Sequence, residues 1–219
     1  EVEQPDEEEP GSEVAPQADE SAGSLTKSVE IEICDDLSED EDEVYTVTTK
    51  AVTNTWGKDA TVHILRITEA GSYTLTKDSN ATKLWCVEIA AGSGTVELTL
   101  SNVTLDLSTT GPASAIKPGV PALAITGGCK TVITLVGENT LKGGIDCAGL
   151  QNGEHPVTIT GGGFLTAVGG YRGAGIGGGV NANGGNITIN GGNVTATGGL
   201  SGAGIGGGYD SQWNGGTYK

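Results

Sequence analysis

Apolar residues alternate with threonine in short runs along most of the chain from Val44 onward. Alternation with a period of two is typical of β-strands, because successive side chains of a strand point to opposite faces. Four such runs share the order apolar, threonine, apolar and occupy residues 98–100, 133–135, 157–159 and 187–189. If these strands stack in parallel, their aliphatic side chains point inward and their threonines form an outward ladder of Thr99, Thr134, Thr158 and Thr188.

A near-exact internal repeat lies toward the C-terminus. The sequences TAVGG and GAGIGGG within residues 166–179 return as TATGG and GAGIGGG within residues 195–208, a period of 29 residues. Units of this kind stack, because each one covers the apolar face of its neighbour. Three short strands fit in each period, so we expect an all-β chain that forms a three-sided parallel β-helix with about 29 residues per coil. Adjacent coils would lie ~4.8 Å apart.

The GAGIGGG block has one face made of glycine. In a strand, Ala174 and Ile176 point to one side, whereas Gly173, Gly175 and Gly177 leave the other side without side chains. A bare face allows close approach by another backbone or by a flat ligand. Both interpretations are open, and tight packing between coils is the favoured one.

Composition divides the chain into an acidic head and a neutral body. Residues 1–43 hold 18 of the 28 acidic residues and a single base, so they account for the whole net charge of −17. The head has almost no large apolar groups and cannot bury enough surface to offset its ordering entropy. The sequence predicts a disordered acidic linker at 1–27, an irregular β lead-in or N-terminal cap at 28–91, and the β-helix at 92–219.

We expect the β-helix to be truncated at its C-terminal end. Residues 215–219, GGTYK, align with GGNIT at 184–188, so another coil begins where the sequence stops. Further coils or domains of the same chain are therefore expected partners. The chain has no basic patch for nucleic acid and no apolar run long enough for membrane insertion.

Four cysteines, Cys34, Cys86, Cys129 and Cys147, lack CxxC spacing and do not resemble a zinc site. Cys129 and Cys147 lie on consecutive segments, where either a disulfide between neighbouring coils or isolated buried thiols is compatible with the sequence. We expect no metal site and no cofactor.

Several segments together resemble a known family. They are ITEAGSYTL at 67–75, VELTLSNVTLDL at 96–107, GENTL at 137–141 and the twin GAGIGGG blocks. They look like the carbohydrate-binding-domain-containing proteins of Gram-positive gut and soil bacteria, first catalogued as a domain of unknown function. The resemblance covers roughly residues 67–219. It implies a right-handed parallel β-helix, extracellular or attached to the cell surface, and often one module of a long multidomain protein. It supplies no motif of ligand residues.

Catalysis by this segment is not expected. Polysaccharide-cutting β-helices need paired carboxylates, or an acidic calcium site with a basic residue beside it. The acidic residues after Val44 are scattered singly along the sequence. Folding could bring Glu138, Asp146 and Glu154 together, but a solvated surface is the favoured interpretation. No catalytic residue is assigned.

Sugar binding would use exposed aromatic rings with amide and carboxylate groups beside them. The segment YDSQWN at 209–214 offers this combination directly after the second glycine block, and Tyr171 occupies a loop one coil earlier. Anchoring of the loops is the alternative role. Trp85, inside LWCVEI, is expected in the core. The candidate carbohydrate-binding residues are Tyr171, Tyr209, Asp210, Trp213 and Asn214.

The sequence therefore predicts a non-catalytic extracellular surface module, secreted or on the cell surface, that binds carbohydrate or mediates adhesion. Its expected partners are glycans, cell-wall material or host-surface material. A structural stalk or spacer of a large cell-surface protein is the alternative. An ice-binding or polysaccharide-degrading β-helix ranks below both, because the residues beside Thr99, Thr134 and Thr188 interrupt the regular threonine array that ice binding needs.

Overall fold

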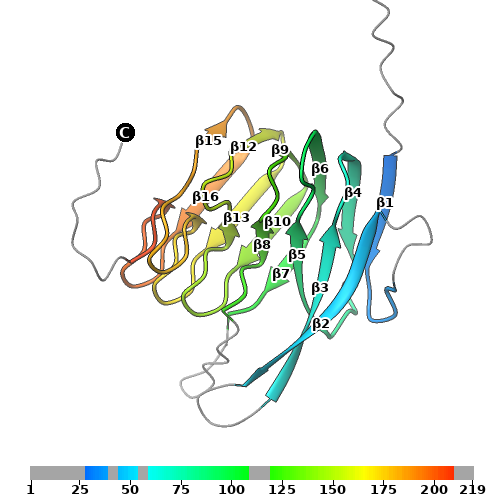
Figure 1. The fold of residues 1–219 in the computed structure, drawn as a ribbon, viewed down its shortest axis with the longest axis horizontal. Helices are drawn as coiled ribbons and strands as arrows, with labels where there is room; N and C mark the ends of the chain where they lie inside the picture. Colours follow the sequence, from blue (N-terminus) through cyan, green and yellow to red (C-terminus); the bar gives the residue numbers. More distant parts are fainter. Residues whose placement is uncertain (1–27, 39–43, 54–58, 109–118, 210–219) are drawn as a thin grey trace, which may run out of the picture.

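The computed structural model describes residues 28–38, 44–53, 59–108 and 119–209, which fold as an all-β solenoid (Figure 1). The acidic segment 1–27, predicted to be disordered, lies outside the described residues. The described strands form three sheets, which we call A, B and C.

The strands of each sheet are given in spatial order. Sheet A contains β1 (Ser28–Ile33), β4 (Gly71–Lys77), β6 (Thr95–Ser101), β9 (Lys130–Val136), β12 (Val157–Gly161) and β15 (Ile187–Ile189). Sheet B contains β2 (Tyr45–Thr53), β3 (Asp59–Ile67), β5 (Leu84–Ile89), β8 (Leu123–Ile125), β11 (Leu150–Gln151), β14 (Ile176–Gly177) and β17 (Ile205–Gly206). Sheet C contains β7 (Thr104–Asp106), β10 (Glu138–Lys142), β13 (Phe164–Val168) and β16 (Asn193–Thr197).

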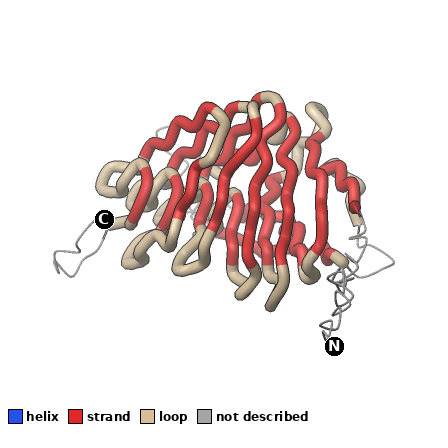
Figure 2. The backbone as a smooth tube through the Cα atoms, turned by 90° about the horizontal axis from the view of Figure 1, so that it is seen from above, coloured by secondary structure: helices blue, strands red, loops and turns tan. Residues whose placement is uncertain are grey.

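From β6 onward the chain visits the three sheets in turn, so each coil contributes one strand to each side of the solenoid. The coil that begins with β6 continues to β7 in sheet C and β8 in sheet B before β9 returns to lie beside β6. These strands pair in parallel with those of the next coil, and the coils lie side by side along the long axis (Figure 1, Figure 2). The arrangement confirms the predicted parallel β-helix.

The 29-residue coil holds only at the C-terminal end. Paired residues are 29 positions apart between β13 and β16 and between β14 and β17. The offset is 26 between β10 and β13, and it is 35 between β6 and β9. Paired strands of neighbouring coils must match residue for residue along the sheet. The differences in coil length therefore lie in the corner loops.

The predicted threonine ladder on sheet A is correct at its ends and wrong in the middle. Thr99 pairs with Thr134, and Thr158 pairs with Thr188, as predicted. However, Thr134 pairs with Thr160 rather than with Thr158. The error is two residues, and a shift of two leaves every side chain on the same face. The apolar pattern that guided the prediction is therefore satisfied by both registers.

The inward faces of the three sheets share one hydrophobic core. Leu98, Leu100, Ile133 and Leu135 are buried, whereas the threonines between them are partly exposed. Burial of one such side chain is worth ~1.5–3 kcal/mol relative to exposure. Trp85 is buried in the same core, as predicted.

Strands β1 to β5 occupy the segment predicted as a lead-in or cap. Strand β2 lies at the edge of sheet B and pairs with β3 in antiparallel orientation, whereas every other strand pairing in the described residues is parallel. The loop after β1 is held by Asp35, whose carboxylate accepts hydrogen bonds from the Thr82 and Lys83 backbone N–H groups, each at 3.0 Å, and from the Thr82 hydroxyl at 2.7 Å. The bond from Lys83 and those from Thr82 lower the pKa of Asp35 to about 2.

The glycine face of the GAGIGGG block packs against backbone. Ala174 and Ile176 are buried, as the alternation predicts. A Cβ at Gly173 would lie 2.0 Å from the Cys147 carbonyl oxygen of the preceding coil, and one at Gly177 would lie 1.8 Å from a carbonyl oxygen of the next coil. Close stacking of the coils therefore requires glycine at both positions. Of the two interpretations of this face, the structure supports packing between coils.

The last described coil carries no charge. Within the described residues, β15, β16 and β17 each have a neighbouring strand on one side only, and Ile189 and Ile205 are exposed. Residues 181–208 contain no Lys, Arg, His, Asp or Glu. An uncharged strand edge of this kind is suited to pairing with another strand. The further coil predicted at 215–219 lies outside the described residues.

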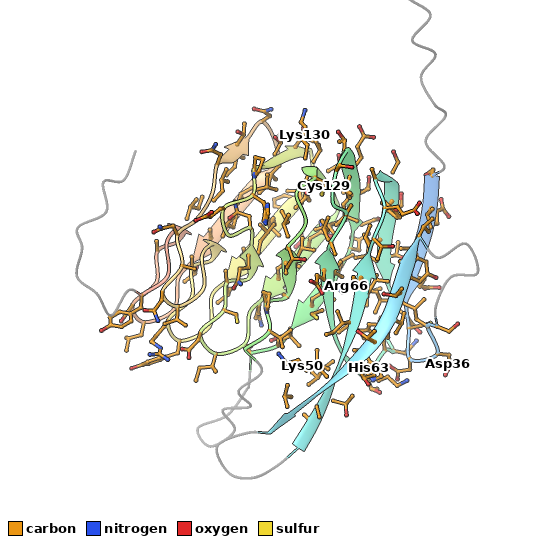
Figure 3. The ribbon with its side chains drawn as sticks, viewed as in Figure 1. Asp36, Lys50, His63, Arg66, Cys129 and Lys130 are labelled. Atoms are coloured by element: carbon orange, nitrogen blue, oxygen red, sulfur yellow. The ribbon has the colours of Figure 1, made fainter. Side chains whose placement is uncertain are left out.

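All four cysteines are free thiols. The disulfide considered between Cys129 and Cys147 is absent, because the two residues occupy different corners of the coil. Cys129 precedes β9 at the corner between sheets B and A, beside Lys130 (Figure 3), whereas Cys147 lies between β10 and β11 at the corner between sheets C and B. The structure thus agrees with the alternative of buried free thiols at Cys129 and Cys147. Burial raises the pKa of Cys86 to about 12 and that of Cys147 to about 11.

Candidate functional site

The structure describes two of the five predicted sugar-binding residues and brings their loops together. Tyr171 follows β13 in the loop that leads to β14, and Tyr209 follows β17 one coil later. Asp210, Trp213 and Asn214 lie outside the described residues.

Backbone hydrogen bonds join these loops. The Tyr209 N–H donates to the Arg172 carbonyl at 2.8 Å, and the Asn181 N–H donates to the Tyr209 carbonyl at 2.7 Å. Asn181 has a φ of 57°, a left-handed conformation that asparagine adopts more readily than most residues. A Cβ at Gly208 would lie 2.8 Å from the Arg172 carbonyl oxygen, so glycine permits the close approach. The main chain therefore sets the relative position of Tyr171 and Tyr209.

Arg172, which directly follows Tyr171, forms an ion pair with Asp146 of the preceding coil. Arg172 Nε and Nη2 each donate to one Asp146 carboxylate oxygen at 2.6 Å, which makes the pair bidentate. The hydrogen bonds to Asp146 raise the pKa of Arg172. Desolvation opposes this rise, and the negative charge of Asp146 adds to it. Tyr171 directly precedes Arg172 in the chain, and the Tyr209 N–H is bonded to the Arg172 carbonyl, so both tyrosines adjoin Arg172 through the main chain.

We call Asp146, Tyr171, Arg172 and Tyr209 the corner cluster. Tyr171 is 55% exposed and Tyr209 is 36% exposed. Each phenol offers an apolar ring face and a polar hydroxyl, and the ion pair adds donors and acceptors without net charge. The corner cluster can therefore hold a neutral, polyhydroxylated ligand through ring contacts and hydrogen bonds.

Asp146 is not among the site residues predicted from the sequence. It lies 26 residues before Arg172, which is the offset between β10 and β13. The 29-residue period of the repeat aligns Arg172 with Gly143 instead. Asp146 could have been identified only with the true length of this coil.

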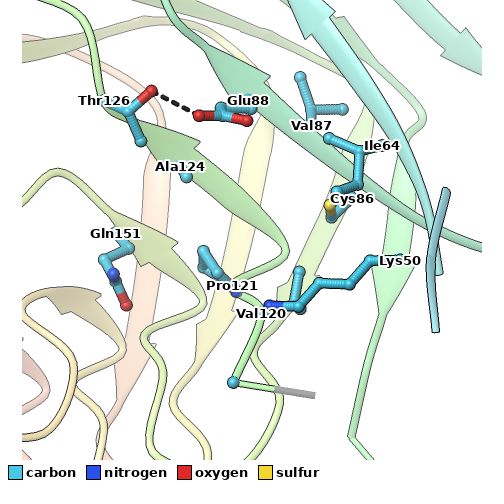
Figure 4. Close-up of a pocket in the computed structure, with 11 residues that line it drawn as sticks. Lys50, Ile64, Cys86, Val87, Glu88, Val120, Pro121, Ala124, Thr126 and Gln151 are labelled. Atoms are coloured by element: carbon cyan, nitrogen blue, oxygen red, sulfur yellow. Dashed lines mark hydrogen bonds between the residues drawn. The ribbon is translucent and has the colours of Figure 1, made fainter. Parts of the chain in front are cut away.

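A separate hollow of about 200 Å³ lies on the outer face of sheet B (Figure 4). Its apolar lining includes Cys86 and Val120, which belong to a second, smaller buried cluster. Lys50 and Gln151 lie on opposite sides of it, on β2 and β11 (Figure 4). No sequence motif marks this hollow, which is smaller than the ~300–1,000 Å³ of typical ligand pockets.

The carboxylate that lines this hollow is already paired. Glu88 accepts hydrogen bonds from Arg66 Nη2 at 2.9 Å and from the Thr126 hydroxyl at 2.7 Å. Burial pulls the pKa of Glu88 upward, but the hydrogen bonds from Arg66 and Thr126 outweigh it and the pKa is lowered. Glu88 thus stays ionised, which does not suit a general acid.

The acidic residues considered as a cluster do not meet. Glu138 begins β10 in sheet C, Asp146 lies in the corner before β11, and Glu154 lies in the corner after it. Within the described ranges, no group of three or more His, Cys, Asp or Glu side chains is placed to hold a metal ion. The same part of the chain has no helix that could span a lipid bilayer.

Comparison with known families agrees with this architecture. A family model described as a beta helix repeat matches residues 157–180 and 187–209. Residues 157–209 thus contain beta helix repeats. The two matched ranges coincide with β12 to β14 and with β15 to β17, the last two described coils. No match was found among curated proteins or among solved structures.

Proposed function

We propose that the chain is a non-catalytic carbohydrate-binding module of a secreted or cell-surface bacterial protein, and that the corner cluster is its binding site. One observation carries the proposal. Two exposed tyrosines from successive coils, Tyr171 and Tyr209, adjoin Arg172 through the main chain, and Arg172 is paired with Asp146. Loop packing needs no such exposure of aromatic rings.

The ligand is a neutral glycan. A sugar ring has an apolar C–H face and a rim of hydroxyls, which match a phenol face and the donors and acceptors beside it. An anionic ligand would have to compete with Asp146 for Arg172, and that pair is bidentate at 2.6 Å. Neutral hydroxyls can bind at its margin without breaking it.

The resemblance of residues 67–219 to carbohydrate-binding-domain-containing proteins supports the proposal. It also supports an extracellular location, with cell-wall or host-surface glycans as partners. In this proposal the solenoid displays the corner cluster, and further coils or domains of the same chain place it at the surface.

A non-catalytic role is supported by the positions of the carboxylates. Glycosidases place two carboxyl groups ~5–9.5 Å apart on either side of the scissile bond. Asp146 and Glu88 are each bound to an arginine, and Glu138 and Glu154 lie elsewhere on the coil. The proposal therefore assigns no catalytic residue.

A structural stalk or spacer is the second candidate. The uncharged edge of the last described coil favours it, because another coil can extend that edge. Ice binding is less well supported, since the outward row next to Thr99 and Thr134 on sheet A contains Glu97 paired with Val132. A stalk makes no use of the corner cluster.

A glycan array with the purified 219-residue chain tests the proposal. We expect specific signals for neutral glycans, and a loss of about tenfold in affinity, or ~1.4 kcal/mol, in Tyr171→Ala and in Tyr209→Ala. Val136→Ala is the matched control, because Val136 is 46% exposed on sheet A, away from the corner cluster. A stalk gives no specific signal, and equal binding by Tyr171→Ala and Val136→Ala would contradict the assigned site.

A further inference from the structure

Sheet C presents a regular outer surface next to the corner cluster. Its four strands pair in register, so outward side chains form columns that run from coil to coil. Successive rungs of a column are ~4.8 Å apart. One column consists entirely of threonine, namely Thr104, Thr140, Thr166 and Thr195.

The column beside these threonines contains an exposed aromatic ring. Phe164 is the only phenylalanine of the chain, and it is 48% exposed. Its neighbour along β13, Leu165, points inward and is buried. Phe164 pairs across the sheet with Glu138 on one side and Asn193 on the other, and both are exposed. A phenylalanine that serves packing is usually buried. An exposed ring between a carboxylate and an amide is instead suited to contact with a sugar.

Strand β13 leads from this ring to the corner cluster. Phe164, Thr166 and Val168 alternate outward along the strand, and the loop after it carries Tyr171. At ~3.3 Å per residue, the row from Phe164 to Val168 is ~13 Å long. The row therefore has an aromatic residue near each end and a hydroxyl between them.

Charge around this row is low. Lys142, which pairs with Val168 across the sheet, is bound to Asp106 at 2.7 Å. Glu138, which pairs with Phe164 across the sheet, is an exposed acidic residue beside the row, and it disfavours an anionic polymer. An uncharged ligand fits this surface best.

We propose that the outer face of β13, from Phe164 to Tyr171, extends the corner cluster into a track for a linear, uncharged polysaccharide. This inference rests on the proposed function and names its substrate class. A terminal sugar needs only the corner cluster, whereas the second aromatic ring contacts a ligand long enough to run along the strand.

Calorimetric titration with oligosaccharides of two lengths tests the track. The probes are cellobiose and cellohexaose, and chitobiose and chitohexaose, added to the full chain. We expect a hexasaccharide to bind at least about tenfold more tightly than its disaccharide. Phe164→Ala should remove this advantage and leave disaccharide affinity unchanged, whereas Phe164→Tyr should keep it. Tyr171→Ala should weaken binding of both lengths.

The outcomes separate the track from the proposed function. Equal affinities for the two lengths, or a length dependence that survives Phe164→Ala, would overturn the track and leave the corner cluster in place. A dimer in sedimentation equilibrium that Phe164→Ala abolishes would assign this face to self-association and also overturn the track. Failure of all four probes, together with a blank glycan array, would overturn both proposals.

Discussion

Replacing Gly173 with alanine should destabilise the solenoid by about 2–4 kcal/mol. The added Cβ would lie 2.0 Å from the Cys147 carbonyl oxygen and 2.3 Å from its carbonyl carbon. Both are backbone atoms of the preceding coil, so they cannot rotate away as the end of a side chain can. Overpacking a tight contact costs ~1–3 kcal/mol. The hydrogen bond from the Gly170 N–H to the same Cys147 carbonyl, 2.9 Å long, adds ~0.5–1.5 kcal/mol if it is lost.

Gly162→Ala, in the same coil, is the matched control. A Cβ on Gly162 meets no atom within 4 Å, and the φ of Gly162 lies outside the left-handed region. Alanine there should be neutral or should stabilise by ~0.4–1 kcal/mol through the unfolded chain. Thermal unfolding followed by circular dichroism compares the two variants. At ~2–4 °C per kcal/mol, Gly173→Ala should lower Tm by ~4–16 °C. Equal melting temperatures for the two variants would refute the close backbone contact between these coils.

Two further predictions concern the titrating groups. The folded pKa of Asp35, about 2, lies below its ordinary 3.8, so this carboxylate stabilises the fold above about pH 4 and loses that effect as the pH falls toward 2. The difference in Tm between the native chain and Asp35→Asn should therefore shrink across this range, and a constant difference would show that Asp35 is not the cause. In a thiol titration of the folded chain, the partly exposed Cys34 should react first, because pKa values of about 12 and about 11 keep Cys86 and Cys147 protonated. All four thiols should react after unfolding without reductant, and a total of two would reveal a disulfide.

The fold class can be predicted from features that do not depend on which residues of neighbouring coils pair. Alternation marks strands, and the twin GAGIGGG blocks mark stacked units, so a parallel β-helix is predictable without knowledge of the register. The register, that is, which residues of neighbouring coils pair, is not predictable from these features. Thr158 and Thr160 are both outward and both threonine, so the choice of partner for Thr134 depends on the 26-residue length of one coil. That length is set by the corner loops, in which the sequence has no periodicity.

The candidate site shows the same limit. Tyr171 and Tyr209 are predictable as exposed aromatic residues beside the glycine blocks, but the backbone bond that brings Tyr209 to Arg172 depends on how two loops pack. Asp146 is visible only at the correct coil offset. Phe164 was not predicted as a site residue. It pairs with Asn193 of the next coil, so an apolar residue occupies an outward position that is polar in the repeat. That difference was the available signal.

The central claim is that a glycan binds at the corner cluster. Amide chemical-shift mapping of the chain, titrated with the glycan that gives the strongest array signal, tests it most directly. We predict that the largest shifts fall on Asp146, Tyr171, Arg172 and Tyr209 and saturate with the binding isotherm. Saturable shifts confined to the hollow between Lys50 and Gln151, or no shifts with any glycan, would contradict the claim.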